Sequence, residues 1–186
     1  ECTMAQWSSV YLEQALGIDK IWGDIFGVAL FALMLGLGRT LYAKYGKNIR
    51  KVLFLGSLGA TICYLTAAVT DVPFVGLFAC GLTGLCTSML WPGSLVVAAE
   101  RFPTSGVFIY AMMAAGGDLG ASVGPQLVGL ITDVSMSNPY LSNIASQLGI
   151  SSEQFGMKCG MIVGMLFPLA GIFVFLHLMK NHTDKQ

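Results

Sequence analysis

One carboxylate stands in the middle of a long apolar run, and no other residue of this sequence points so directly to chemistry. Asp118 lies within residues 106–131, which are mostly apolar or small. An ionisable side chain at membrane depth costs at least ~2.5 kcal/mol on insertion scales, so such groups usually face protein or water and mark a path for solute or protons. We therefore expect Asp118 to be functional. The alternative is that it only joins two helices through hydrogen bonds.

The same run predicts a helix with two different sides when residues are placed at ~100° each. Its polar and small residues fall on one side: Asp118, Ser122, Pro125, Gln126, Gly129 and Asp133. Its larger apolar residues fall on the other side: Leu119, Val123, Leu127 and Leu130. The first side suits a polar path, and the second suits lipid.

The composition indicates a protein that crosses a membrane several times. Hydrophobic residues make up 55% of the chain and charged residues 11%, and the mean hydropathy is +0.71. A net charge of zero gives no sign of a nucleic-acid partner. The five cysteines are scattered without a CxxC pair, so they indicate neither a metal site nor a disulfide framework. We expect the lipid bilayer as a partner and no cofactor.

The apolar runs predict an all-α membrane unit, residues 1–186, with five full spans and the end of a sixth. The expected spans are residues 1–12, 21–42, 52–69, 74–99, 106–131 and 156–179. Pro92 should bend the fourth run, residues 74–99, because proline removes a backbone hydrogen bond. A short surface helix is expected within residues 133–155. A rise of ~1.5 Å per residue places Glu1 roughly 16 Å deep, near the midplane. The chain is expected to be a fragment of a longer protein.

Basic residues predict the orientation. Eight of the ten Lys and Arg residues fall on one side when residues 39–51, the Arg101 loop and the C-terminal tail face the cytoplasm. We therefore expect a multi-pass protein of the plasma (inner) membrane with a cytoplasmic C-terminus.

Six spans with this loop pattern resemble the C-terminal half of a major facilitator superfamily transporter. The loop after the second run is similar to that family's cytoplasmic G-x-x-x-D-R-x-G-R motif, with Ala43 at the aspartate position, through Gly38, Arg39, Lys44, Gly46 and Lys47. Two further stretches are similar to the family's E-R-F-P-T loop and G-x-x-x-G-P helix: Glu100 with Arg101, and Gly120 with Gly124 and Pro125. The resemblance implies a missing N-terminal six-helix half as a partner.

A narrower resemblance is to the fucose-permease-like sugar transporters. It rests on Glu1, Trp7 and Tyr11 in the first span and on Gly38-Arg39 in the second. The resemblance implies that Glu1 is a proton or sugar ligand and that Trp7 is a stacking platform. The alternative for Trp7 and Tyr11 is a belt of aromatic residues at the membrane surface.

A sugar site would need carboxylate or amide groups and an aromatic face within a cavity of modest size. The candidates for this path, together with Ser122, are Glu1, Gln6, Asp118, Gln126, Trp7 and Trp91. A carboxylate desolvated at membrane depth can take up and release a proton near neutral pH. These residues predict proton-coupled symport of a sugar or similar solute, and Glu1 and Asp118 should open onto one concave surface.

Three other functions remain open. A drug/proton antiporter of the same superfamily would have a larger, more aromatic cavity, whereas converging amides and carboxylates favour sugar. A purely structural subunit would have an occluded polar face. An intramembrane serine protease would use the G-x-S-x-G match at Ser122 with His177 as base. Rise per residue puts those two side chains roughly 20 Å apart in depth, and a hydrogen bond needs about 3 Å, so we do not expect an enzyme.

Overall fold

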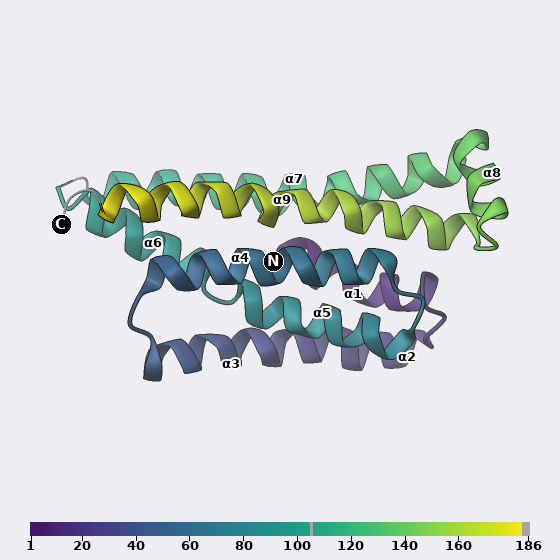
Figure 1. Ribbon diagram of the computed structural model, residues 1–186, viewed down its shortest axis with the longest axis horizontal. Coiled ribbons are helices and arrows are strands. Elements are labelled where there is room, and N and C mark those ends of the chain that lie inside the picture. The colour runs from purple at the N-terminus through teal and green to yellow at the C-terminus, as the bar shows by residue number, and fades with distance from the viewer. Residues whose placement is uncertain (105, 184–186) are drawn as a thin grey trace.

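The computed structural model describes residues 1–104 and 106–183, and all regular elements of that part of the chain are helical (Figure 1). In chain order they are α1 (Cys2–Gln14), α2 (Lys20–Trp22), the π-helix η1 (Gly23–Val28), α3 (Ala29–Tyr45), α4 (Ile49–Val69), α5 (Pro73–Thr87), α6 (Leu90–Arg101), α7 (Gly106–Ser137), α8 (Pro139–Gln147) and α9 (Ser152–Thr183). Apart from α8, which lies at one end, the longer helices run roughly along one axis.

Five helical segments are long and apolar enough to cross a membrane. They are Lys20–Tyr45, Ile49–Val69, Pro73–Arg101, Gly106–Ser137 and Ser152–Lys180. Large apolar side chains lie exposed along them, such as Leu33 at 70% and Phe74 at 73%, as is expected where lipid covers the surface. The prediction of an all-helical multi-pass chain is confirmed, with α1 as the shorter sixth element.

The second predicted run contains a π-helix rather than one regular helix. Within η1, Gly23 and Gly27 are buried against α1, and a Cβ at position 27 would lie 2.6 Å from Leu12 Cδ1. The Ser9 hydroxyl of α1 donates a hydrogen bond to the Asp24 carboxylate of η1. Glycine and this polar contact therefore hold the irregular segment close to α1.

The fourth predicted run is divided into two helices close to Pro92. Pro92 has no N–H, so the Ser88 carbonyl four residues earlier lacks its helical donor. The helix ends at Thr87 and resumes at Leu90. The Arg39 side chain of α3 supplies a replacement donor, with Nε 3.2 Å from the Ser88 oxygen. The predicted bend is confirmed, and the break lies on the N-terminal side of the proline.

The basic connection predicted for residues 39–51 is much shorter than expected. The helix α3 continues to Tyr45, and α4 begins at Ile49 after Asn48, whose side chain accepts a hydrogen bond from the Lys51 N–H. The loop assignment is therefore wrong for Gly38, Arg39 and Lys44, which are helical, while Gly46 and Lys47 do lie in the turn. Neither glycine nor proline interrupts the chain between Arg39 and Tyr45, so the helical hydrogen bonds continue.

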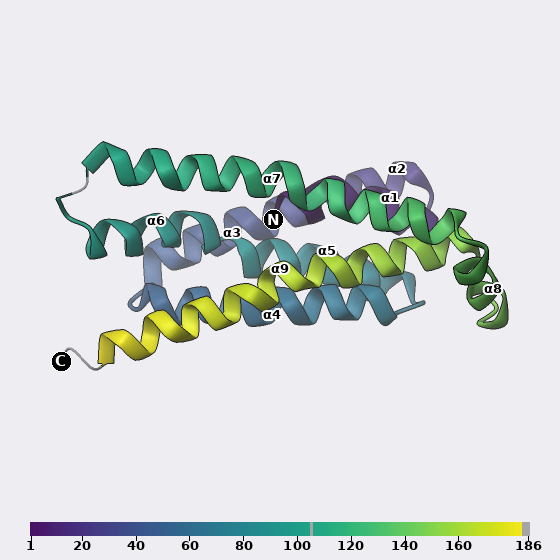
Figure 2. The same cartoon turned by 90° about the horizontal axis from the view of Figure 1, so that it is seen from above.

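The polar connection after the fifth run also differs from its predicted extent. The helix α7 includes residues 133–137, and the expected short helix is present as α8, capped by Asn138, which accepts a hydrogen bond from the Tyr140 N–H at 2.9 Å. Figure 2 shows α7 and α9 converging toward α8 and diverging toward their other ends.

Close packing at two glycines sets the point from which α7 and α9 diverge. A Cβ at Gly160 would lie 2.6 Å from Thr132 Oγ1 and 3.0 Å from Val128 Cγ1, and a Cβ at Gly156 would lie 2.9 Å from the Thr132 carbonyl oxygen. Only glycine allows this approach. Beyond it, Pro125 and Pro168 stand inside α7 and α9, where the two helices separate.

Candidate functional site

Two hollows adjoin the contact between α1 and α7. The carboxylate cavity has a volume of about 560 Å³ and lies among α1, α4, α5, α6, α7 and α9. The amide hollow has a volume of about 500 Å³ and lies between α1 and α7. We define the first by Glu1, Ser57, Tyr64, Trp91, Asp118 and Phe167, and the second by Gln6, Trp7, Pro125, Gln126, Gly129 and Asp133.

The carboxylate cavity brings together the two acids singled out in the sequence. Glu1, at the start of α1, and Asp118, in the first half of α7, both line it. Figure 1 places the N-terminus near the middle of the long axis, as expected from the depth assigned to Glu1. The prediction that Glu1 and Asp118 open onto one concave surface is confirmed.

The indole of Trp91 lies directly against the turn of α7 that carries Asp118. A Cβ at Gly117 would be 2.5 Å from two carbons of the Trp91 ring, Cη2 and Cζ3. Glycine at this position therefore lets the indole approach the α7 backbone. The arrangement places an aromatic ring beside an acidic residue on the cavity wall.

The two acids differ in their charged neighbours. Glu1 Oε1 lies 3.4 Å from Arg39 Nη2, and both side chains are partly exposed. The same guanidinium binds the Ser88 carbonyl at the break between α5 and α6. Asp118 takes part in none of the ion pairs found within residues 1–104 and 106–180. Arg39, expected in a surface loop, thus balances the charge of one cavity acid and leaves the other unbalanced.

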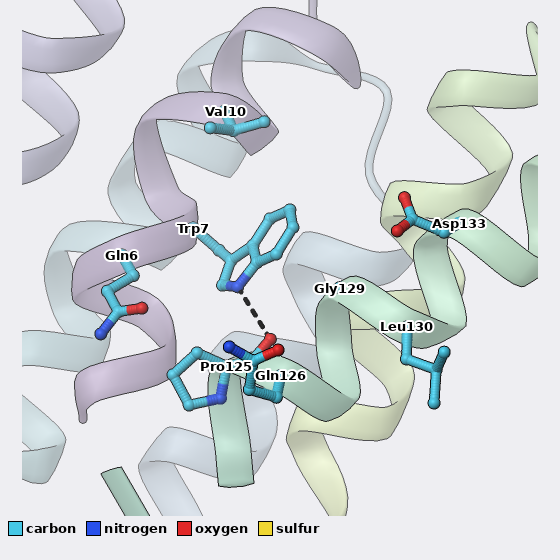
Figure 3. Close-up of a pocket in the computed structure, with 8 residues that line it drawn as sticks. All are labelled: Gln6, Trp7, Val10, Pro125, Gln126, Gly129, Leu130 and Asp133. Atoms are coloured by element: carbon cyan, nitrogen blue, oxygen red, sulfur yellow. Dashed lines mark hydrogen bonds between the residues drawn. The ribbon is translucent and has the colours of Figure 1, made fainter. Parts of the chain in front are cut away.

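The amide hollow contains three further predicted path residues, Gln6, Trp7 and Gln126 (Figure 3). Trp7 Nε1 donates a hydrogen bond to the Pro125 carbonyl at 3.2 Å, and a Cβ at Gly129 would be 3.0 Å from Trp7 Cζ2. Figure 3 shows the indole between α1 and α7, with the Gln126 amide beside Pro125. The indole is therefore held in place by both helices.

The predicted path residues are divided between the two hollows instead of sharing one. Gln6, Trp7 and Gln126 line the amide hollow, whereas Glu1, Asp118 and Trp91 line the carboxylate cavity. The reason is rotation about α7. At ~100° per residue, the α7 positions that line the cavity centre near Gly117, and those that line the amide hollow centre near Asp133, roughly 140° away around the helix.

Ser122 lines neither hollow, contrary to its assignment to the path. Its side chain is exposed, and its hydroxyl donates to the Asp118 carbonyl of the same helix at 2.8 Å. It sits one position beyond Ala121 and thus faces away from the cavity. His177, the proposed base of a protease, lines neither hollow either.

The aromatic pair predicted in the first span does not form a surface belt. Tyr11 is fully buried, and its hydroxyl donates to the Ala67 carbonyl at 2.5 Å. Trp7 is half-buried and bonded to α7. The belt interpretation is wrong for Tyr11, which joins α1 to α4.

The remaining motif residues lie away from both hollows. Glu100 forms an ion pair with Arg50 at 2.7 Å, joining the end of α6 to the start of α4. Arg101 is the last residue of α6, and Lys44 lies 5.2 Å from the centroid of the Tyr45 ring. These contacts organise one end of the bundle.

Sequence reasoning missed the wall that α4 and α9 contribute. From α9 the cavity takes Gly164, Pro168, Gly171 and Phe175, which follow helical spacing and could have been read as one face. From α4 it takes Tyr64 and Ser57; Ser57 is 1% exposed, and its hydroxyl has no hydrogen-bond partner among the described residues. No pattern in the sequence predicts that α4 packs against α9.

The described residues contain no group of three or more His, Cys, Asp or Glu side chains placed to hold a metal ion. No protein-family model, curated protein or solved structure matches this chain.

Proposed function

We propose that this chain forms part of a secondary transporter of the major facilitator type that carries a small polar solute, such as a sugar, together with protons. One observation carries the proposal: α1 and α7 hold two adjoining hollows, one with amides and an indole and one with two acids. Both lie in a chain whose five long apolar segments are suited to a bilayer.

The amide hollow is the proposed solute site. Gln6 and Gln126 each offer amide donors and a carbonyl acceptor, and Asp133 offers carboxylate oxygens. A polyhydroxylated solute needs such paired groups because each hydroxyl both donates and accepts. The Trp7 ring provides an apolar face, and its hydrogen bond to Pro125 fixes that face before the solute arrives.

Asp118 is the proposed proton carrier. Arg39 forms an ion pair with Glu1 at 3.4 Å. Asp118 lacks a counter-charge in the described bundle. An acid of this kind inside a membrane protein is characteristic of a proton path.

A second helical half would complete the site. Transporters of this type bind solute between two halves that move about a central site, and Gln6, Gln126 and Asp118 are exposed on the present bundle. We propose that these residues face the N-terminal half, with lipid around the other helices. The C-terminus and the end with the Arg50–Glu100 pair are then cytoplasmic.

The test is uptake of a labelled sugar panel by the full-length protein in liposomes with an imposed pH gradient. Asp118→Asn should abolish accumulation against a gradient while exchange of solute persists, because binding remains and proton coupling is lost. Glu153→Gln, at an exposed acid in the first turn of α9, is the matched control and should transport normally. If Asp118→Asn still accumulates solute like the wild type, the proposed proton coupling through Asp118 is wrong. If the wild type takes up none of the sugars, the proposed solute class is wrong.

A drug/proton antiporter is the second candidate, and the lining of the carboxylate cavity favours it. Four aromatic side chains surround the two acids there: Tyr64, Trp91, Phe167 and Phe175. An aromatic, acidic cavity suits an apolar cation better than a polyol.

A further inference from the structure

We propose that the carboxylate cavity binds an organic ammonium ion with an aromatic or otherwise apolar body. This site is separate from the solute site in the amide hollow, and it does not depend on the identity of that solute. The ammonium would meet Asp118 and the face of Trp91, and its body would occupy the space between α7 and α9.

The charges on the cavity wall favour a cation. Two carboxylates line the cavity, and no Lys, Arg or His is among its described lining residues. Arg39 approaches Glu1 from α3, which leaves the charge of Asp118 without a partner. A lone carboxylate in such a place is stabilised by a mobile cation, so the cavity should attract ammonium ions and reject anions.

The aromatic ring is placed where a cation would need it. The Trp91 indole packs on Gly117, immediately before Asp118. An ammonium near the carboxylate is therefore also near an indole, the side chain that attracts cations most strongly. Phe167 and Phe175 of α9 and Tyr64 of α4 add apolar surface for the body of the ligand.

Two hydroxyls of the cavity wall have oxygens that act as acceptors only. The Thr87 hydroxyl donates to the Thr83 carbonyl at 2.8 Å, and the Ser94 hydroxyl donates to the Leu90 carbonyl at 2.6 Å. Their donors are used, so the two oxygens can only accept. An ammonium brings three donors and no acceptor, which matches the carboxylates and these two hydroxyl oxygens.

The far wall contains one hydroxyl that still lacks a partner. Ser57 lines the cavity, is 1% exposed, and makes no hydrogen bond among the described residues. A buried polar group without a partner is costly, so a ligand oxygen that reaches this hydroxyl would gain a hydrogen bond. An aryl ammonium with an oxygen at its far end should therefore bind more tightly than the same ion without that oxygen.

The experiment measures binding of 2-phenylethylammonium to the full-length protein in lipid nanodiscs by calorimetry. The neutral analogue 2-phenylethanol, which replaces the ammonium by a hydroxyl, controls for the apolar body. Charge recognition should give the ammonium at least about tenfold tighter binding, since hydrogen bonds to charged groups exceed neutral ones by roughly that factor. Equal affinity for the two compounds would overturn the proposal.

Two neighbouring glycines provide a matched pair of variants that leave every charge intact. Gly117→Ala would push the indole off α7, because its Cβ would meet Trp91 ring atoms at 2.5 Å, whereas Gly116→Ala meets nothing within 4 Å. Loss of the indole should weaken ammonium binding about 2- to 30-fold, and Gly116→Ala should bind like the wild type. Equal binding by the two variants would contradict the role of Trp91.

A second pair of variants tests the carboxylate. Asp118→Asn should weaken ammonium binding about tenfold or more and leave 2-phenylethanol binding unchanged, while Glu153→Gln should change neither. If ammonium binds both Asp118→Asn and Gly117→Ala as tightly as it binds the wild type, the proposed cation site is wrong. This holds even if sugar uptake depends on Asp118. If the wild type takes up no sugar but ammonium binding still weakens in these variants, only the proposed solute would be excluded. The cation site would then stand.

A third pair tests the unpartnered hydroxyl. Ser57→Ala should remove the preference for 2-(4-methoxyphenyl)ethylammonium, which carries an oxygen at its far end, over 2-phenylethylammonium. Ser8→Ala is the control, because Ser8 is also buried and unpartnered among the described residues but does not line the cavity. A preference that persists in Ser57→Ala would exclude Ser57 from the site.

Discussion

The contact between α7 and α9 at Gly160 can be tested by adding a single methyl group. Gly160→Ala would place a Cβ 2.6 Å from Thr132 Oγ1, 3.0 Å from Val128 Cγ1 and 3.2 Å from the Val128 carbonyl oxygen. The Thr132 hydroxyl cannot simply turn away, because it donates to that same carbonyl at 2.9 Å. Either this hydrogen bond breaks or the two helices separate by roughly 0.4 Å to restore a 3.0 Å contact.

The cost of that change follows from the packing. Adding a methyl group to a filled interface costs about 1–3 kcal/mol, and a lost hydrogen bond alone would cost about 1 kcal/mol. Alanine also gains up to about 1 kcal/mol over glycine in a helix. Gly36→Ala in α3 has the same gain and meets nothing within 4 Å. The difference between the two variants should therefore be about 1–3 kcal/mol.

Thermal unfolding of both variants in detergent, followed by circular dichroism, checks this value. For a chain of this size, 1 kcal/mol corresponds to roughly 2–4 °C, so Gly160→Ala should unfold about 2–12 °C below Gly36→Ala. Equal melting temperatures would show that α7 and α9 do not touch as described. Such a result would also remove the physical basis of the carboxylate cavity, which lies where these helices diverge.

Three further substitutions have definite expected results. Tyr11→Phe removes the hydrogen bond to the buried Ala67 carbonyl and should lower stability by about 1 kcal/mol, measured by thermal unfolding; no change would mean that the bond is absent in solution. Lys158→Met breaks the ion pair with Asp71, whose side chain is 66% exposed, so the loss should stay below about 1 kcal/mol and vanish in high salt; a larger, salt-independent loss would argue against this pair. Trp7→Phe keeps an aromatic ring but loses the Nε1 donor; KM for the transported solute should rise several-fold with little change in kcat, and unchanged uptake kinetics would separate Trp7 from the solute site.

Features that depend on neighbouring residues could be predicted from the sequence. Each long apolar run had to form a helix because backbone groups in lipid must bond within the segment, and the five expected spans agree with the five long helices. Pro92 interrupts its helix because the missing N–H is a property of the residue itself. The sharing of one surface by Glu1 and Asp118 was also predictable, since both were placed at similar depth.

Features that depend on the rotation and pairing of helices were decided only by the tertiary structure. The rotation of α7 about its own axis decides that Gln126 and Asp118 line different hollows. No local sequence pattern determines that rotation. The assignment of Arg39 to a loop failed because the segment lacks helix breakers. Its pairing with Glu1 depends on the packing of α3 against α5, at whose end Arg39 also binds the Ser88 carbonyl. The local sequence determines which residues share a helix face, but close packing of the whole bundle determines which helix that face contacts. Ser57 of α4 illustrates this, because it packs against Gly171 of α9 although its hydroxyl finds no hydrogen-bond partner there.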